Sequence, residues 1–137
     1  PMRLEHISKT TVKVIEYLKQ HPTIEEVIFP FDENFPQLQL AKQQMQGACG
    51  LLSFYLKPAS LQAIEQFCES LQHIMMAVSW GGHESLIIPK CAGISSADFD
   101  VNNRDHRMIR LYVGLEDADY LIKDLEQALG KMEMGEM

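Results

Sequence analysis

Apolar residues recur at helical spacing along the first part of the chain. Leu4, Ile7, Val14 and Leu18 fall on one side of a helix with about 3.6 residues per turn. Pro22 ends this pattern, because proline disfavours helical geometry in the residue before it. The sequence therefore predicts one long amphipathic helix over residues 4–21.

The rest of the chain alternates between short apolar runs and further helical patterns. Strands are predicted at residues 27–29, 51–57, 74–78 and 108–113, and we expect the strand at 74–78 to be buried and residues 84–88 to be extended. Helices are expected to begin at Pro36, after an N-cap at Ser60 and after a cap at Asp117, with the last one ending before Gly130. Residues 89–107 indicate a long irregular connection, and residues 131–137 a frayed tail.

These elements follow one another in the order αβαβαββα, without an internal repeat. At 137 residues the chain has the size of one domain and can bury a core. We expect an α+β fold, an α/β sandwich in which one small sheet carries helices mainly on one face. Such a layout serves many functions and indicates none by itself.

Charge and cysteine content narrow the classes of partner. A net charge of -7 argues against nucleic acid or an anionic membrane, since neither attracts an acidic protein. Cys49, Cys68 and Cys91 are odd in number and widely spaced, which favours neither a disulfide framework nor a zinc site. No apolar run approaches the roughly 20 residues of a membrane-spanning helix. We expect a cytoplasmic protein whose partners are small molecules or other proteins.

Motifs of complete catalytic sites are missing from the sequence. It contains no H-E-x-x-H, no G-x-G-x-x-G after a strand, no Walker loop and no G-x-S-x-G elbow. The histidines are scattered without the spacing of metal ligands, at His6, His21, His73, His83 and His106. We therefore assign no metal ligand and no catalytic residue to this chain.

Arg110 is the first candidate binding residue. In the strand at 108–113, the period of two puts Ile109 and Leu111 on the core face and Arg110 with Tyr112 on the opposite face. A guanidinium held by a strand can grip a carboxylate through two parallel charge-assisted hydrogen bonds. The pattern alone also fits an arginine that is paired with a neighbouring acid on a solvated face.

The second candidate is the turn Ser79-Trp80-Gly81-Gly82, which follows an apolar run. Glycines permit a close approach of the backbone, so main-chain N–H groups and the Ser79 hydroxyl could meet an anion there. The alternative is an ordinary turn in which Trp80 packs into the core.

Four segments of the chain resemble one enzyme family, and two of them are motifs in the same order and at matching separation. They are residues 77–87 (AVSWGGHESLI), 109–117 (IRLYVGLED), 121–125 (LIKDL) and the glycine-led strand at 50–54. Together they resemble the Cys/Met metabolism (transsulfuration) family of fold-type I pyridoxal-phosphate (PLP) enzymes. The motifs S-W-G-G and E-S-L are most similar to those of cystathionine β-lyases. The resemblance implies a mostly antiparallel sheet, like that of the C-terminal domain of these enzymes.

The resemblance also implies roles for single residues. Arg110 matches the arginine that binds the substrate α-carboxylate, and Ser79 matches a serine beside it. Trp80 would contribute backbone and pocket wall. Val78 stands where cystathionine γ-lyases often have a glutamate, which speaks against that specificity.

The family's cofactor-holding residues lie in a large domain for which this sequence has no counterpart. By resemblance, residues 1–137 form a single C-terminal small domain, with residues 1–21 as an interdomain helix. Such a chain would neither hold PLP nor turn over substrate alone. Its partners would be a sulfur amino acid and its own large PLP domain, in a homotetramer with no nucleic acid and no membrane.

Two alternatives to a β-lyase-like reaction remain open at the level of sequence. The parent enzyme could be a cystathionine γ-synthase, a cystathionine γ-lyase or a methionine γ-lyase. The chain could also be a standalone regulatory module that binds amino acids, or a protein-interaction domain.

Overall fold

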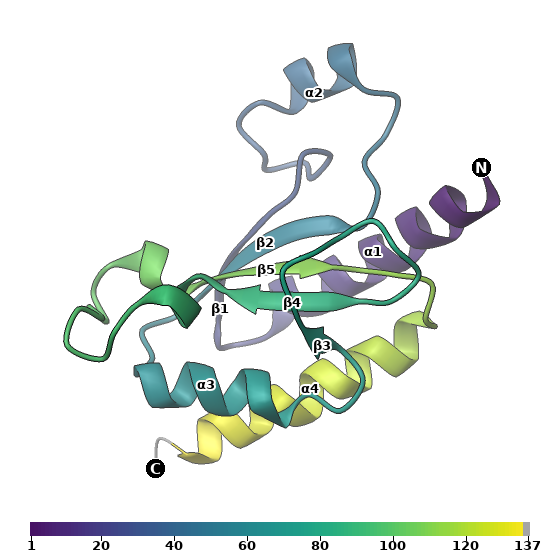
Figure 1. Ribbon diagram of the computed structural model, residues 1–137. Coiled ribbons are helices and arrows are strands. Elements are labelled where there is room, and N and C mark those ends of the chain that lie inside the picture. Colours follow the sequence, from purple (N-terminus) through teal and green to yellow (C-terminus); the bar gives the residue numbers. More distant parts are fainter. Residues whose placement is uncertain (136–137) are drawn as a thin grey trace.

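The chain forms a single sheet with helices, as the computed structural model in Figure 1 shows. The structure describes the backbone of residues 1–135 and the side chains of residues 1–132. The helices are α1 (Met2–Gln20), α2 (Leu38–Gln44), α3 (Leu61–Ser70) and α4 (Ala118–Gly135), with short 3₁₀ turns η1 (Lys90–Gly93) and η2 (Arg104–Arg107). The strands are β1 (Ile24–Ile28), β2 (Leu51–Leu56), β3 (Met75–Met76), β4 (Leu86–Pro89) and β5 (Met108–Tyr112).

The five strands lie in the order β1-β2-β5-β4-β3. The β1–β2, β2–β5 and β4–β5 pairs are antiparallel, and the short β3 runs parallel to β4. The sheet is therefore mostly antiparallel, and β5 occupies its centre. The predicted α+β fold is confirmed.

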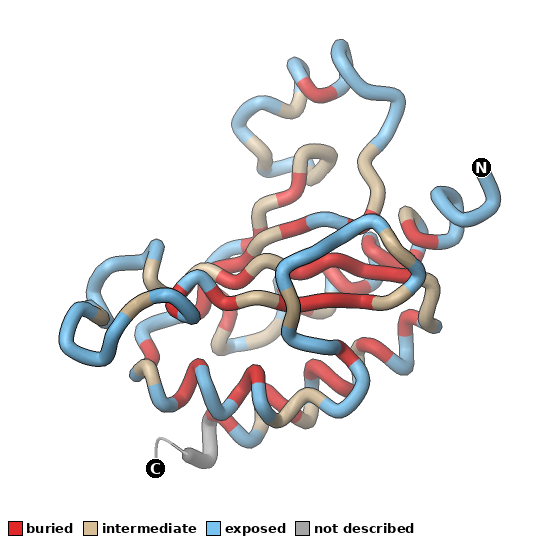
Figure 2. Tube along the Cα trace, viewed as in Figure 1, coloured by how far each residue is buried: buried red, intermediate tan, exposed pale blue. Residues whose placement is uncertain are grey.

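The core lies between one face of the sheet and helices α1, α3 and α4 (Figure 1). Phe54 of β2 and Ile109 of β5 are fully buried against Leu18 of α1, Phe67 of α3 and Leu125 of α4. Burying one such side chain contributes about 1.5–3 kcal/mol. The helices thus cover one face, as the sequence predicts, and Figure 2 shows the buried residues following the strands and the inward sides of these helices.

Local sequence explains where the helices begin and end. The Ser60 side chain accepts a hydrogen bond from the Ala63 N–H at 3.1 Å, which confirms the predicted N-cap of α3. The carbonyl of Asp117 accepts the Leu121 N–H at 3.1 Å at the start of α4. Helix α1 ends at Gln20, in front of Pro22 as expected.

The prediction of a buried strand at residues 74–78 is wrong. Only Met75 and Met76 form a strand, and each is 52% exposed, whereas Ile74 is buried. The reason is position: β3 is an edge strand that pairs only with β4, and the helices do not cover these two side chains. An apolar run alone does not distinguish an edge strand from a central one.

The predicted end of the last helix before Gly130 is also wrong. Helix α4 continues to Gly135, and Met132 is buried in the core. Glycine inside a helix costs about 1 kcal/mol relative to alanine, and burial of Met132 offsets that cost. Of the tail that we expected to fray, residues 136–137 lie outside the described part of the chain.

The connection at 89–107 has more structure than expected, since it contains η1 and η2. Buried Arg107 fastens it: the Nε atom donates to the Leu56 carbonyl at 3.0 Å, and the Nη1 atom donates to the Val101 carbonyl. Arg104 stacks over the Tyr55 ring with its guanidinium carbon 3.8 Å from the ring centre. Within the described residues, no helix is long and apolar enough to span a membrane.

Candidate functional site

Arg110 projects from the central strand on the face that the helices leave open. Its Cα pairs with Ser53 of β2 on one side and with Ile88 of β4 on the other. The side chain is half-buried, and it makes no hydrogen bond or ion pair with the side chains or backbone that the structure describes. The sequence also allowed Arg110 to be paired with a neighbouring acid. Among the described residues, Arg110 has no such partner. The guanidinium therefore keeps its N–H donors available for a carboxylate.

The connection between β3 and β4 crosses the same open face (Figure 1). It leaves β3 where the Ala77 N–H donates to the Ile87 carbonyl at 3.1 Å, and it returns where the Leu115 N–H donates to the His83 carbonyl at 2.8 Å. Between these points Val78 is 81% exposed and Trp80 is 61% exposed. The reading of Trp80 as a core residue is wrong, because the turn stands away from the core.

Tyr112 links this connection to the strand of Arg110. It lies two residues after Arg110 and thus on the same face of β5, and its hydroxyl donates to the Gly82 carbonyl at 2.9 Å. Tyr112, Trp80 and Gly81 line a cavity of about 610 Å³ together with the start of α1. No hydrogen bond within the described chain joins Arg110 to Ser79. The structure places the two candidates at one face of the sheet without direct contact.

The segments 77–87 and 109–117, which resemble the family, contact each other through Ser85 and Glu116. The sequence did not predict this contact. Ser85 is fully buried; its N–H and its hydroxyl donate to the Glu116 carboxylate at 3.0 Å and 3.1 Å. The Gly114 N–H donates to the Ser85 hydroxyl oxygen at 2.8 Å. These residues hold the end of β5 to the start of β4, so their role is structural. The sequence did contain a signal for this contact, because a serine and a glutamate each stand next to an apolar strand.

Gly50 and Gly114 are required by close packing at the ends of these strands. A Cβ atom at Gly114 would lie 2.4 Å from the His83 carbonyl oxygen, and one at Gly50 would lie 2.2 Å from the Val113 carbonyl oxygen. Real Cβ atoms do not approach so closely, so neither position accepts a side chain without displacing backbone. The two glycines allow the connections that frame the open face to lie tightly against β5.

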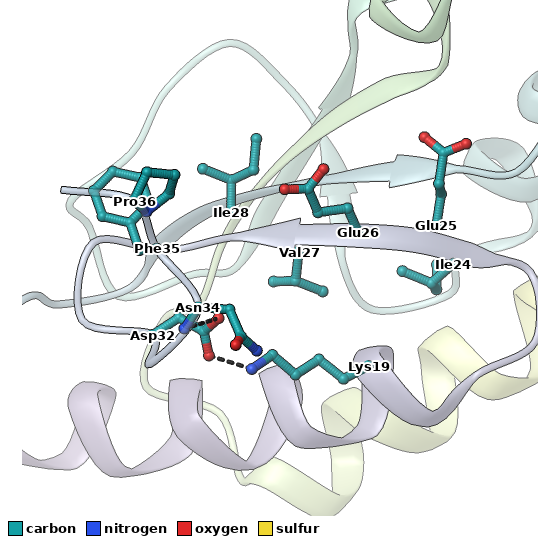
Figure 3. A pocket seen from close by; sticks show the side chains of 10 residues that line it. All are labelled: Lys19, Ile24, Glu25, Glu26, Val27, Ile28, Asp32, Asn34, Phe35 and Pro36. Atoms are coloured by element: carbon teal, nitrogen blue, oxygen red, sulfur yellow. Dashed lines mark hydrogen bonds and ion pairs between the residues drawn. The ribbon is translucent and has the colours of Figure 1, made fainter. Parts of the chain in front are cut away.

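Another hollow, of about 500 Å³, lies along the free edge of β1 (Figure 3). Its charged groups already have partners. Lys19 forms an ion pair with Asp32, which also accepts the Asn34 N–H, while Glu25 and Glu26 pair with Arg104. The bulge in β1 between Ile24 and Glu26 and the two glutamates are devices that protect an edge strand from further pairing. This hollow is therefore a weaker candidate than the open face.

The lysines of this chain lie in a different environment from a lysine that binds an aldehyde cofactor covalently. A lysine that forms a Schiff base is normally desolvated in a pocket, and every lysine of this chain is exposed. Burial raises the pKa of Cys68 to about 12, and burial likewise raises the pKa of Cys91, so both thiols stay protonated and unreactive. The described residues include no group of three or more ligands that could hold a metal ion.

Comparison with known proteins gives the family. The model of the Cys/Met metabolism PLP-dependent enzymes matches residues 1–130. The chain belongs to this family. Membership agrees with the resemblance of the four motif segments and confirms that assignment.

The matched relatives are longer enzymes. The chain is 39% identical over 132 residues to human cystathionine γ-lyase, which covers 93% of the chain and 32% of the relative. It is 35% identical over 136 residues to the L-methionine γ-lyase of Treponema denticola, covering 96% of the chain and 33% of the relative. The chain therefore spans about a third of the length of these relatives.

Solved structures of the family share the fold. Cystathionine γ-synthase from Xanthomonas oryzae pv. oryzae, in complex with aminoacrylate and cysteine, superposes with a TM-score of 0.83 at 28% identity. The match covers 97% of this chain and 35% of that one. The five-stranded sheet with its helices is thus the fold of the corresponding third of a family enzyme.

Proposed function

We propose that this chain is the C-terminal, carboxylate-binding domain of a PLP-dependent enzyme that eliminates the sulfur group of an amino acid such as cystathionine. The observation that carries the proposal is the guanidinium of Arg110 on the central strand, which has no partner among the described residues and lies at the face the helices leave open. A planar, always-charged group fixed in this way suits a bidentate grip on an α-carboxylate. Family membership supplies the reason to expect an amino acid there.

Arg110 would contribute by positioning. A substrate held at its carboxylate presents its remaining bonds in one orientation to a reactive group on a facing domain, which lowers the entropic part of the barrier. Ser79, Trp80 and Val78 would form the adjacent wall, since the turn that carries them crosses the same face. No catalytic group is required from this chain.

The cofactor would be held by a large domain that precedes this one. PLP supplies electron withdrawal from the substrate, and the protein supplies binding and orientation. The exposed lysines of this chain fit with a cofactor held elsewhere, as does its coverage of about a third of its relatives. We infer that the chain is inactive alone, that the complete protein is a cytoplasmic homotetramer, and that residues 1–21 connect the two domains.

We propose β-elimination as the reaction, on the S-W-G-G and E-S-L motifs and on Val78 in place of a glutamate. The alternative, a γ-lyase or γ-synthase reaction, is favoured by the names of the matched relatives. Product analysis separates the two. With one water consumed, elimination at the β-carbon of cystathionine releases homocysteine, pyruvate and ammonia, whereas elimination at the γ-carbon releases cysteine, 2-oxobutanoate and ammonia.

The role of Arg110 is tested with the variants Arg110→Ala and Arg110→Lys in the complete enzyme. The control is Lys13→Ala, which also removes one positive charge, at an exposed position. We expect Arg110→Ala to lower kcat/KM by at least about 100-fold, with the bound-cofactor absorption spectrum unchanged and Lys13→Ala near wild type. Lysine should rescue only part of the activity because it lacks the planar fork. Loss of cofactor with intact amino-acid affinity would show that Arg110 has another role.

Isothermal calorimetry on the isolated chain distinguishes an independent amino-acid-binding module. A half-site open to water binds a carboxylate weakly, because solvent screens the single ion pair. Tight, saturable binding of cystathionine or methionine by the 137-residue chain would favour the module instead of the enzyme domain.

A further inference from the structure

We propose that Tyr112 is a positioning residue: its hydroxyl anchors the turn at residues 78–82 and so sets where Ser79 and Trp80 stand over the face that carries Arg110. The anchoring itself follows from contacts within this chain. Its consequence for substrate binding rests on the proposed function.

The first observation is that Tyr112 and Arg110 belong to one rigid surface. Their Cα atoms pair with Leu51 and Ser53 of the neighbouring β2, so both side chains rise from the same face of the central strand. Tyr112 is only 3% exposed. The crossing turn, through Trp80 and Gly81, and the start of α1 line the same cavity as Tyr112.

The second observation is that the Tyr112 ring packs against the backbone of Gly50. A Cβ atom at Gly50 would lie 3.1 Å from the Cε1 atom of the Tyr112 ring, so the ring packs directly on the Gly50 backbone. The hydroxyl then reaches the Gly82 carbonyl oxygen at 2.9 Å. Tyr112 therefore connects strand β5 to the turn at residues 78–82.

The third observation is that the turn has little else to hold it. Residues 78–81 make no hydrogen bond with other described parts of the chain, between the Ala77 anchor on one side and Gly82 on the other. Gly81 has a φ of +95°, a backbone conformation that only glycine adopts easily. The Tyr112 hydroxyl is thus the nearest fixed point on the C-terminal side of Ser79 and Trp80.

The donor is stable over a wide pH range. Burial raises the pKa of Tyr112, the neighbouring Cys49 raises it further, and Arg3 opposes both. The phenol consequently stays protonated at neutral pH and continues to donate to the carbonyl.

The anchor is tested with Tyr112→Phe, which keeps the ring and removes only the hydroxyl. Trp80 is the single tryptophan, so its indole N–H gives one side-chain signal in a ¹⁵N NMR spectrum of the chain. We expect the indole order parameter to fall towards the values below about 0.6 that mark flexible segments. Tyr55→Phe is the matched control: this buried tyrosine lies on the same face, makes no hydrogen bond through its hydroxyl within the described chain, and should leave the indole signal unchanged.

The consequence for binding is tested in the complete enzyme. Loss of one positioning hydrogen bond should raise KM for the amino acid about two- to ten-fold while kcat changes less than about two-fold. Tyr55→Phe should change neither constant.

The outcomes separate the two claims. An unchanged indole order parameter in Tyr112→Phe overturns the anchor. A mobile turn with unchanged KM, in an enzyme whose Arg110→Ala variant binds substrate weakly, overturns the positioning role. If Arg110→Ala itself leaves KM unchanged, the proposed function fails, and the NMR result still decides whether Tyr112 holds the turn.

Discussion

The Glu116 carboxylate accepts two hydrogen bonds from Ser85, one from the backbone N–H and one from the hydroxyl. The two residues are 31 positions apart in the sequence. They join the motif that leads into β4 to the motif that follows β5. A polar contact therefore fastens the end of β5 to the start of β4, beside the strand that carries Arg110.

Ser85→Ala should lower the free energy of unfolding by about 1–3 kcal/mol, because it leaves the Gly114 N–H without a partner and the Glu116 carboxylate with one hydrogen bond fewer. Urea denaturation of the 137-residue chain measures this. Ser95→Ala removes an exposed hydroxyl from a loop and should change stability much less. Equal effects of the two substitutions would contradict the structural role of Ser85.

Gly114→Ala and Gly130→Ala should act in opposite directions. A methyl group at Gly114 would meet the His83 carbonyl oxygen at 2.4 Å, whereas a methyl group at Gly130 meets no atom within 4 Å. We expect Gly114→Ala to destabilise the fold by more than about 1 kcal/mol, and Gly130→Ala, inside helix α4, to stabilise it by up to about 1 kcal/mol. Thermal melting of both variants decides the point, and stabilisation by Gly114→Ala would show that the backbone there yields easily.

Asp124 should make stability depend on pH in the acid range. Burial by itself raises the pKa of Asp124, but the backbone N–H groups of Gln72, Ile74 and His73 and the Gln127 amide outweigh it, and the pKa lies below its usual value of 3.8. A depressed pKa in the folded state means that the stabilisation is complete above pH 3.8 and is lost as the pH falls through the folded-state pKa.

Asp124→Asn should therefore lower stability at neutral pH by about 1.5–3 kcal/mol and flatten the decline below about pH 4. Denaturation at a series of pH values measures both effects. Glu126→Gln, an exposed position of the same helix, should leave the pH profile close to that of the wild type. If the stability of Asp124→Asn still declined below about pH 4 as in the wild type, Asp124 would not be the cause of that decline.

Arg107 and Arg110 lie three residues apart and should separate stability from function. Arg107 is buried and donates to the Leu56 and Val101 carbonyls, so Arg107→Ala should destabilise the chain by at least about 2 kcal/mol. Arg110 makes no such bonds with described residues, and Arg110→Ala should change the free energy of unfolding by less than about 0.5 kcal/mol. A large loss of stability in Arg110→Ala would mean that its side chain serves the fold.

Periodicity predicted much of the site's frame. The alternation along β5 placed Arg110 and Tyr112 away from Ile109 and Leu111, and the register of β5 with β2 agrees with it. The same method failed at Met75 and Met76, which are apolar but exposed. A run of apolar residues shows that burial of the segment would be favourable. It does not show whether a neighbouring element covers the segment.

The sequence by itself determined the helices, the central strands and the face on which Arg110 lies, because these depend on local spacing and on the two-residue alternation of a strand. Only the tertiary structure decided that Arg110 has no partner among the described residues, that the Tyr112 hydroxyl donates to the Gly82 carbonyl, and that Glu116 accepts from Ser85. Those contacts join residues that are distant in sequence, so they exist only once the strand order has brought them together.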